Sequence, residues 1–92
     1  MLKKMKKYIR NNDTITGKLH DEQVMLDIEK GKYFSLNPVA TRIWEILEQP
    51  LGIDELCNLL LEEYEVDTKQ CKIETNEYLI QLVKLGLIRE IL

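Results

Sequence analysis

One short run in the first third of the chain alternates between apolar and polar positions. Between residues 24 and 29, Val24, Leu26 and Ile28 fall on one face of an extended chain, which is the period-two pattern of a half-buried strand. Lys30 and Gly31 follow as a two-residue connection in which glycine can take a positive φ, so they predict a hairpin turn. Weaker β-leaning runs lie on either side. The sequence therefore predicts three short antiparallel strands at residues 13–19, 24–29 and 32–36.

The rest of the chain shows helical spacing. Asn37 before Pro38 predicts a helix start, because asparagine accepts orphan amide protons and proline at the first helical position loses no needed donor. Helices are expected between Asn37 and Pro50, from about Asp54 to Tyr64, and from Asp67 or Thr68 to the cap residue Gly86. In the second helix the expected buried stripe is Leu56, Leu59, Leu60 and Tyr64. In the third, which is the longest, it is Cys71, Thr75, Tyr78, Leu79, Leu82 and Val83.

The order of the expected elements is three strands followed by three helices. A small three-stranded sheet cannot stand alone and needs a helical layer across one face. Ninety-two residues make one domain. We therefore expect an α+β fold of winged-helix-like order βββααα, built from residues 13–92, behind a basic and flexible N-terminal tail at residues 1–12.

The charge of the chain is unevenly distributed. Its formal net charge is −3, yet residues 1–12 hold five basic residues and no acid, which leaves −8 for the rest of the chain. Nucleic-acid binding needs a basic patch on the folded surface, so an acidic body with a short basic tail argues against it. A winged-helix nucleic-acid-binding regulator stays open as a minor alternative.

The sequence offers little for catalysis or metal binding. Cys57 and Cys71 are fourteen positions apart on different expected helices, and the single histidine, His20, falls in a polar turn. This spacing supports neither a zinc site nor a nucleophile with its base. We expect a protein without catalytic activity, cofactor or metal. Since no secretory signal or membrane span stands out, we also expect a cytoplasmic location.

Binding is the function class that remains. The strand at residues 32–36 is the last of the expected sheet, and an uncovered edge offers free N–H and C=O groups to an added peptide strand. No proline interrupts this strand. The third helix is expected to form the other wall of a groove. The expected peptide-binding residues are Lys32, Tyr33, Phe34, Ser35, Leu36, Lys69, Lys72, Asn76, Leu79 and Val83.

The spacing of several residues also resembles a known family. Between Gly31 and Leu47 the chain reads G-x-Y-x-x-L-N-x-x-A-x-x-I-W-x-x-L. Further matching positions are Leu56, Leu60, Tyr64-Glu65-Val66-Asp67 and Leu82-x-x-x-Gly86-Leu87-Ile88. Together this set resembles the core of the PqqD-like proteins, over about residues 14–90.

The resemblance implies a leader-peptide recognition element. Such modules serve pathways that make ribosomally synthesised, post-translationally modified peptides, and the leader binds as an extra antiparallel strand against the third helix. The chain is most similar to the small leader-binding half of split lasso-peptide B proteins, which escorts the precursor to a separate cysteine protease. Other members act as chaperones for radical SAM enzymes, including in pyrroloquinoline quinone biosynthesis. The expected partners are a leader peptide and a modifying enzyme, with no nucleic acid and no membrane.

Overall fold

The computed structural model describes residues 6–11, 14–19, 22–27 and 32–91. The elements of this part are β1 (Lys7–Arg10), β2 (Thr14–Leu19), β3 (Glu22–Asp27), β4 (Lys32–Leu36), α1 (Pro38–Ile46), α2 (Ile53–Glu63), α3 (Thr68–Lys84) and β5 (Ile88–Ile91). The α+β class with three helices is confirmed, but the expected order βββααα is incomplete, because β1 precedes the three expected strands and β5 follows the helices. The expected turn at Lys30-Gly31 and the polar turn at His20 lie outside the described residues.

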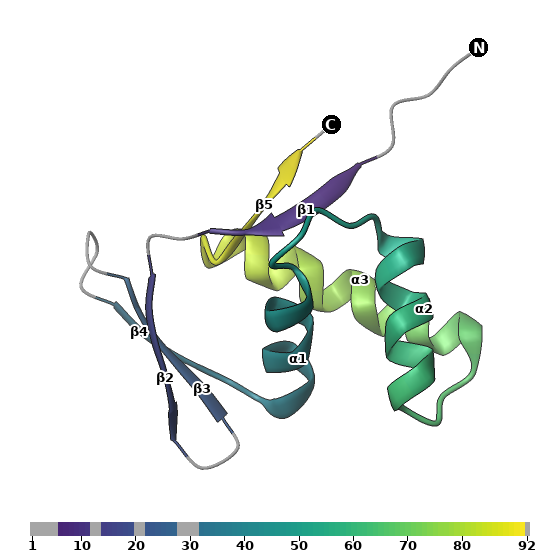
Figure 1. The fold of residues 1–92 in the computed structure, drawn as a ribbon, viewed down its shortest axis with the longest axis horizontal. Coiled ribbons are helices and arrows are strands. Elements are labelled where there is room, and N and C mark those ends of the chain that lie inside the picture. Colours follow the sequence, from purple (N-terminus) through teal and green to yellow (C-terminus); the bar gives the residue numbers. More distant parts are fainter. Residues whose placement is uncertain (1–5, 12–13, 20–21, 28–31, 92) are drawn as a thin grey trace.

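The central strands form an antiparallel sheet in the order β2-β3-β4. In its register Thr14 lies opposite Asp27, and Val24 lies opposite Ser35. The sheet lies beside α1 at one end of the helices, and β4 leads directly into α1 (Figure 1). The bounds of β2, β3 and β4 overlap the three runs that the sequence predicted as strands, at residues 13–19, 24–29 and 32–36.

A second antiparallel sheet joins the two ends of the chain. β1 pairs with β5 over its whole length. On its other side, Tyr8 exchanges two backbone hydrogen bonds with Leu51, with N···O distances of 2.8 and 3.1 Å, and the side chain of Tyr8 is buried. The expectation of a flexible tail is therefore wrong for residues 7–10, because their pairing partner lies at the far end of the sequence.

Trp44 anchors α1 against β1. Its side chain is buried, and the guanidinium of Arg10 lies 4.4 Å from the centre of its ring, within the range of a cation–π interaction. The backbone N–H of Arg10 donates to the carbonyl of Leu47 at 2.9 Å, and its guanidinium lies 3.9 Å from the carboxylate of Glu48. The strand and the helix are thus held together by backbone, aromatic and charged contacts.

Local sequence sets where α1 and α3 begin. The Asn37 side chain accepts a hydrogen bond from the N–H of Ala40 at 2.8 Å, and Pro38 is the first residue of the helix, as expected. At the start of α3, Asp67 accepts from the N–H of Gln70 at 2.8 Å. Asp67 is therefore the cap residue of the two that the sequence allowed.

The start of α2 and the end of α3 depend on glycine. Gly52 precedes α2, and its N–H donates to the side chain of Glu55 at 3.2 Å, so this helix begins one residue earlier than expected. Gly86 has a φ of 76°, and the N–H of Leu87 then donates to the carbonyl of Leu82 at 3.0 Å. This closure of a helix by a left-handed glycine is the Schellman motif.

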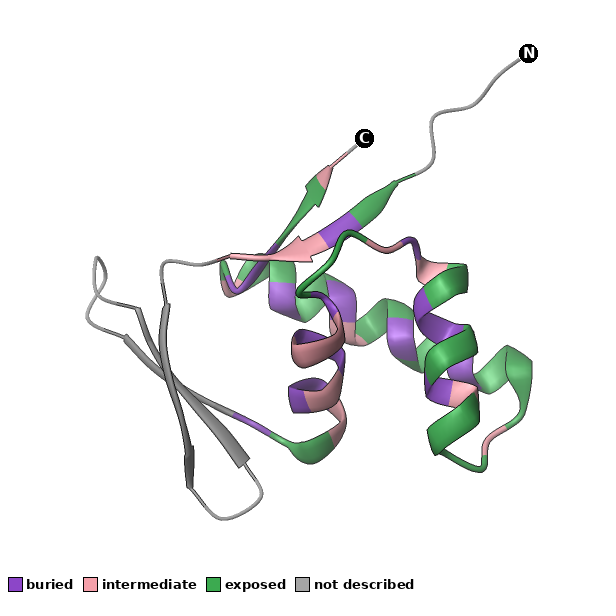
Figure 2. Cartoon of the chain, in the orientation of Figure 1, coloured by how far each residue is buried: buried purple, intermediate pink, exposed green. Residues whose placement is uncertain are grey.

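One hydrophobic core joins the helices, the end of β4 and the second sheet. Buried residues gather where α2 and α3 approach each other and along α1 (Figure 2). The prediction that Leu59 and Tyr64 belong to the buried stripe of α2 is wrong, because each side chain is 38% exposed. The most deeply buried large side chains are Ile43, Leu47, Leu56, Leu79, Leu82, Leu87 and Ile88. Among the described residues, no helix is long and apolar enough to cross a membrane.

Candidate functional site

β4 is an edge strand. It pairs with β3 from Lys32 opposite Asp27 to Leu36 opposite Gln23, and no other strand of the described part pairs with it. In an antiparallel strand, the backbone N–H and C=O groups of one residue point to one side and those of the next residue to the other side. Alternate residues of β4 therefore present donors and acceptors at a side where no described strand covers them.

The C-terminal end of β4 is fixed to two helices. Leu36 is buried, and its carbonyl accepts a hydrogen bond from the Thr41 hydroxyl of α1 at 3.2 Å. The next residue, Asn37, caps α1, and its side-chain amide also donates to the hydroxyl of Tyr78 on α3 at 3.2 Å. The edge strand thus ends on a support that involves both α1 and α3.

A hollow of about 300 Å³ lies between Asn37, the residue that follows β4, and α3, and we call it the polar hollow. Asn37 lines it from the junction of β4 and α1. The other described lining residues come from a single flank of α3, because positions three and four apart share a helix face. They are Glu74, Glu77, Tyr78 and Gln81.

A second hollow, of about 280 Å³, lies between α1, the end of α2 and α3, and we call it the helix pocket. Its wall combines apolar, aromatic and acidic side chains. It shares Glu74 and Tyr78 with the polar hollow, so the two hollows are adjacent. The described lining residues of the helix pocket are Val39, Leu60, Tyr64, Glu65, Val66, Cys71, Glu74, Thr75 and Tyr78.

Three of the expected peptide-binding residues lie on the other flank of α3. Lys69, Lys72 and Asn76 line a hollow of about 400 Å³ that Ile53, at the start of α2, also lines. The ammonium nitrogen of Lys72 lies 3.3 Å from a carboxylate oxygen of Asp54. The structure therefore groups these three residues with the beginning of α2.

The remaining expected residues on α3 are divided between core and surface. Leu79 is 1% exposed within the core. Val83 is 37% exposed, so its expected place in the buried stripe of α3 is wrong. The sequence reasoning missed Glu74, Glu77 and Gln81, which face the end of β4. Their spacing places them on one face, but the opposite flank has equivalent spacing. Which flank faces the sheet depends on how α3 packs, and periodicity alone does not reveal it.

The described lining residues of the polar hollow and the helix pocket include three carboxylates, Glu65, Glu74 and Glu77, and no lysine, arginine or histidine. Arg42 of α1 is bound to another acid, since its guanidinium donates to both carboxylate oxygens of Glu63, at 2.8 and 2.9 Å. This hydrogen bond lowers the pKa of Glu63 and raises that of Arg42. Among the described residues, the two hollows thus form an acidic surface.

The cysteines lie inside the protein. Cys57 and Cys71 are buried free thiols, and burial raises the pKa of the Cys57 thiol. Within the described ranges, no group of three or more His, Cys, Asp or Glu residues is placed to hold a metal ion. The candidate site therefore offers backbone pairing at β4 and shaped, acidic side-chain hollows beside it.

Comparison with known sequences identifies the family. The sequence model described as Coenzyme PQQ synthesis protein D (PqqD) matches residues 22–88. The chain belongs to the PqqD family. The match runs from β3 to the first residue of β5, so it includes the edge strand and both hollows. Among curated proteins, no sequence matches that of this PqqD-family chain.

Solved structures show the same fold. TbiB1 in complex with the TbiA(beta) leader peptide is 27% identical, with a TM-score of 0.77, and the match covers 88% of this chain and 94% of that one. A lasso peptide synthetase B1, complexed with the leader peptide, is 21% identical, with a TM-score of 0.76 over 89% of this chain and 96% of that one. The resemblance to PqqD-like recognition elements is thus confirmed.

Proposed function

We propose that this PqqD-family protein is a non-catalytic adaptor that binds the leader of a ribosomally made precursor peptide as an added β-strand. The leader pairs with the open side of β4, at residues 32–36, and its side chains enter the hollows beside α3. The observation that carries this proposal is the edge of β4 that no described strand covers, together with Asn37, the next residue, which lines the polar hollow beside the helix pocket.

The physical basis is strand addition. Main-chain hydrogen bonds to an edge give affinity, and pockets for alternate side chains give specificity. The contacts of Leu36 with Thr41 and of Asn37 with Tyr78 hold the end of the strand before a peptide arrives, which lowers the ordering cost of binding. In this proposal the winged-helix-like arrangement of sheet and helices serves to keep β4 alongside α3. The 27% identical TbiB1, solved with a leader peptide, supports it.

Two flanks of α3 compete as the second wall of the peptide groove. The flank of Glu74, Glu77 and Gln81 borders the end of β4, and we favour it for that reason. The flank of Lys69 and Lys72, expected from the sequence, is the competing assignment. Chemical shifts of the α3 backbone amides on peptide binding distinguish the two.

The adaptor presents the bound leader to a separate modifying enzyme. A lasso-peptide leader protease is our first candidate, because both solved structures described above are leader complexes of B1-type proteins. A chaperone for a radical SAM enzyme is the second candidate, favoured by the family description as a coenzyme PQQ synthesis protein. Adding the adaptor to each enzyme with its precursor separates them, since only the true partner should gain processing rate.

Calorimetric titration tests the adaptor function. The full chain is titrated with the leader of a precursor encoded beside its gene, and with a scrambled leader of the same composition as the control. We expect a Kd of about 1 μM or tighter for the leader, equivalent to about −8 kcal/mol, and much weaker binding of the scrambled peptide. Equal binding of both peptides, or of neither, would contradict the proposal.

A further inference from the structure

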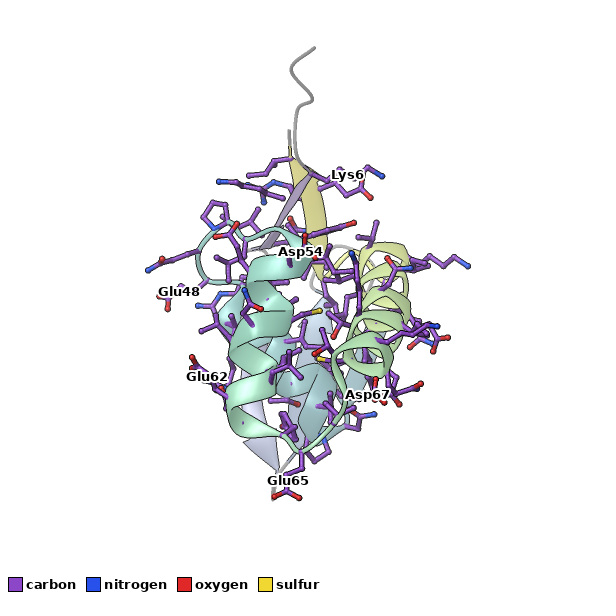
Figure 3. The ribbon with its side chains drawn as sticks, turned by 90° about the vertical axis from the view of Figure 1, so that its right-hand side faces the viewer. Lys6, Glu48, Asp54, Glu62, Glu65 and Asp67 are labelled. Atoms are coloured by element: carbon purple, nitrogen blue, oxygen red, sulfur yellow. The ribbon has the colours of Figure 1, made fainter. Side chains whose placement is uncertain are left out.

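The helix pocket is arranged in layers from its interior to its surface. Leu60, Cys71 and Thr75 are buried and form the inner wall. Glu65 and Glu74 are exposed and form the outer rim. Glu65 lies on the connection between α2 and α3, at the lower end of the molecule in Figure 3. An entering side chain thus meets carboxylates at the rim and a largely apolar wall, with the Thr75 hydroxyl, further in.

Two aromatic rings also line the pocket. Tyr64 is 38% exposed, and Tyr78 is half-buried. The face of a tyrosine ring attracts a cation, and this attraction grows as water is excluded. Val39 and Val66 add aliphatic surface. The combination suits a long apolar stem that carries a positive charge at its tip.

Lysine and arginine are the side chains with this structure, because each buries its methylene stem while keeping its charged head at a polar surface. We propose that the helix pocket receives a lysine or arginine side chain of the bound peptide. The inference rests on the proposed function for the presence of the peptide itself. The stem lies against Val39 and Val66, and the charge lies at the rim formed by Glu65 and Glu74.

The surroundings of the pocket favour a cation over other side chains. Glu77 extends the negative surface into the polar hollow, and Arg42 is already occupied by Glu63. An acidic side chain in the pocket would be repelled by the carboxylates of Glu65 and Glu74 at the rim. A purely apolar side chain would pack against the inner wall but would gain no electrostatic attraction from the carboxylates of the rim.

Selection from a displayed library of random peptides tests this inference and needs no leader of known sequence. The full chain is the target, and bound peptides are assigned to the β4 groove by the amide shifts that they cause at residues 32–36. We expect peptides that share a lysine or arginine at one position. In the best of them, changing that lysine to norleucine should weaken binding about fivefold.

Three single substitutions locate the effect. Glu65→Gln and Glu74→Gln remove rim charges, while Glu62→Gln is the matched control, because Glu62 projects from the side of α2 away from α3 (Figure 3). The lysine-to-norleucine difference should shrink in both rim variants and persist in the control. All three positions are exposed, so the variants should fold.

Each outcome has a distinct meaning. Selected peptides that shift β4 but share no basic residue, or a lysine preference that persists in both rim variants, would overturn the inference and leave the adaptor function standing. A library that yields no binding peptide would overturn both.

Discussion

Asn37 serves two elements at once. Its side-chain oxygen accepts from the N–H of Ala40 at the start of α1, and its side-chain nitrogen donates to Tyr78 of α3. It is also the first residue after β4. A single side chain therefore connects the edge strand to both helices that border the proposed groove.

The loss of this connection should be measurable. We expect Asn37→Ala to lower the free energy of unfolding by about 1–2 kcal/mol, the usual cost of losing an N-cap with a further hydrogen bond. Urea denaturation measures it. Tyr78→Phe is the control, because it removes only the contact between the two side chains. A loss in Asn37→Ala no larger than that in Tyr78→Phe would show that the cap contributes nothing.

The pair of Arg42 and Glu63 gives a pH dependence at the residue scale. The pKa of Glu63 is lowered from its ordinary 4.5 by the hydrogen bond from Arg42. The pair therefore stabilises the fold fully above that ordinary value and loses its effect as the pH falls through the lower folded value. Because both side chains are more than a third exposed, the effect is small.

We expect Glu63→Gln to lower the Tm slightly near neutral pH, and this effect to shrink as the pH falls below the ordinary pKa of a glutamate and through the lowered pKa of Glu63. Thermal unfolding followed by circular dichroism at several pH values checks this. Glu62→Gln, one position earlier, should show no comparable difference. A Glu63→Gln effect of the same size at both ends of the pH range would mean that the ion pair is not its cause.

At the scale of the element, the two sides of β4 have different tasks. One side pairs with β3, and the other, which no described strand covers, is the side proposed to pair with a peptide. Since backbone groups alternate along an antiparallel strand, Phe34 and Ser35 direct their N–H groups to opposite sides. A proline at one position must remove a bond within the sheet, and a proline at the other must remove a bond to the peptide.

Phe34→Pro and Ser35→Pro should therefore differ in kind. One variant should lose stability, and the other should remain folded and bind the leader at least about tenfold more weakly, the equivalent of one hydrogen bond of about 1.4 kcal/mol. Urea denaturation and calorimetry of both variants provide the two readouts. If both variants fold and bind the leader with unchanged affinity, the proposal that the leader pairs with β4 is wrong.

The packing of β1 leads to a second prediction at this scale, which concerns stability. Tyr8 is 9% exposed and its backbone bonds to Leu51, so β1 belongs to the packed unit. We expect Tyr8→Ala to lower the free energy of unfolding by about 3 kcal/mol, as large-to-small changes at buried aromatic positions do. Lys7→Ala, at an exposed position of the same strand, should change it little. Equal and small effects would indicate that the N-terminal strand contributes nothing to stability.

At the scale of the whole molecule, α3 separates two different surfaces. The flank toward the end of β4 carries Glu74 and Glu77. The opposite flank carries Lys69 and Lys72 beside the start of α2. In our proposal a peptide that pairs with β4 meets the acidic flank, which favours a basic side chain in the peptide.

The sequence predicted what depends on neighbouring residues. The caps at Asn37 and Gly86 follow from local backbone chemistry, and the three helices follow from the spacing of apolar residues. The strand β1 was not predicted, because its partner β5 is remote in sequence. The position of the acidic flank of Glu74 and Glu77 beside the end of β4 was not predicted, because the rotation of α3 about its axis is set by tertiary packing. Edge strands are predictable from order, but groove walls depend on three-dimensional placement.

The most direct test of the account is a set of isotope-filtered NOE spectra of the labelled protein with unlabelled leader peptide. Strand addition predicts interstrand NOEs between the peptide backbone and alternate residues of β4, together with side-chain NOEs to Tyr78. NOEs confined to the flank of Lys69 and Lys72, from a saturated complex with none to β4, would contradict it.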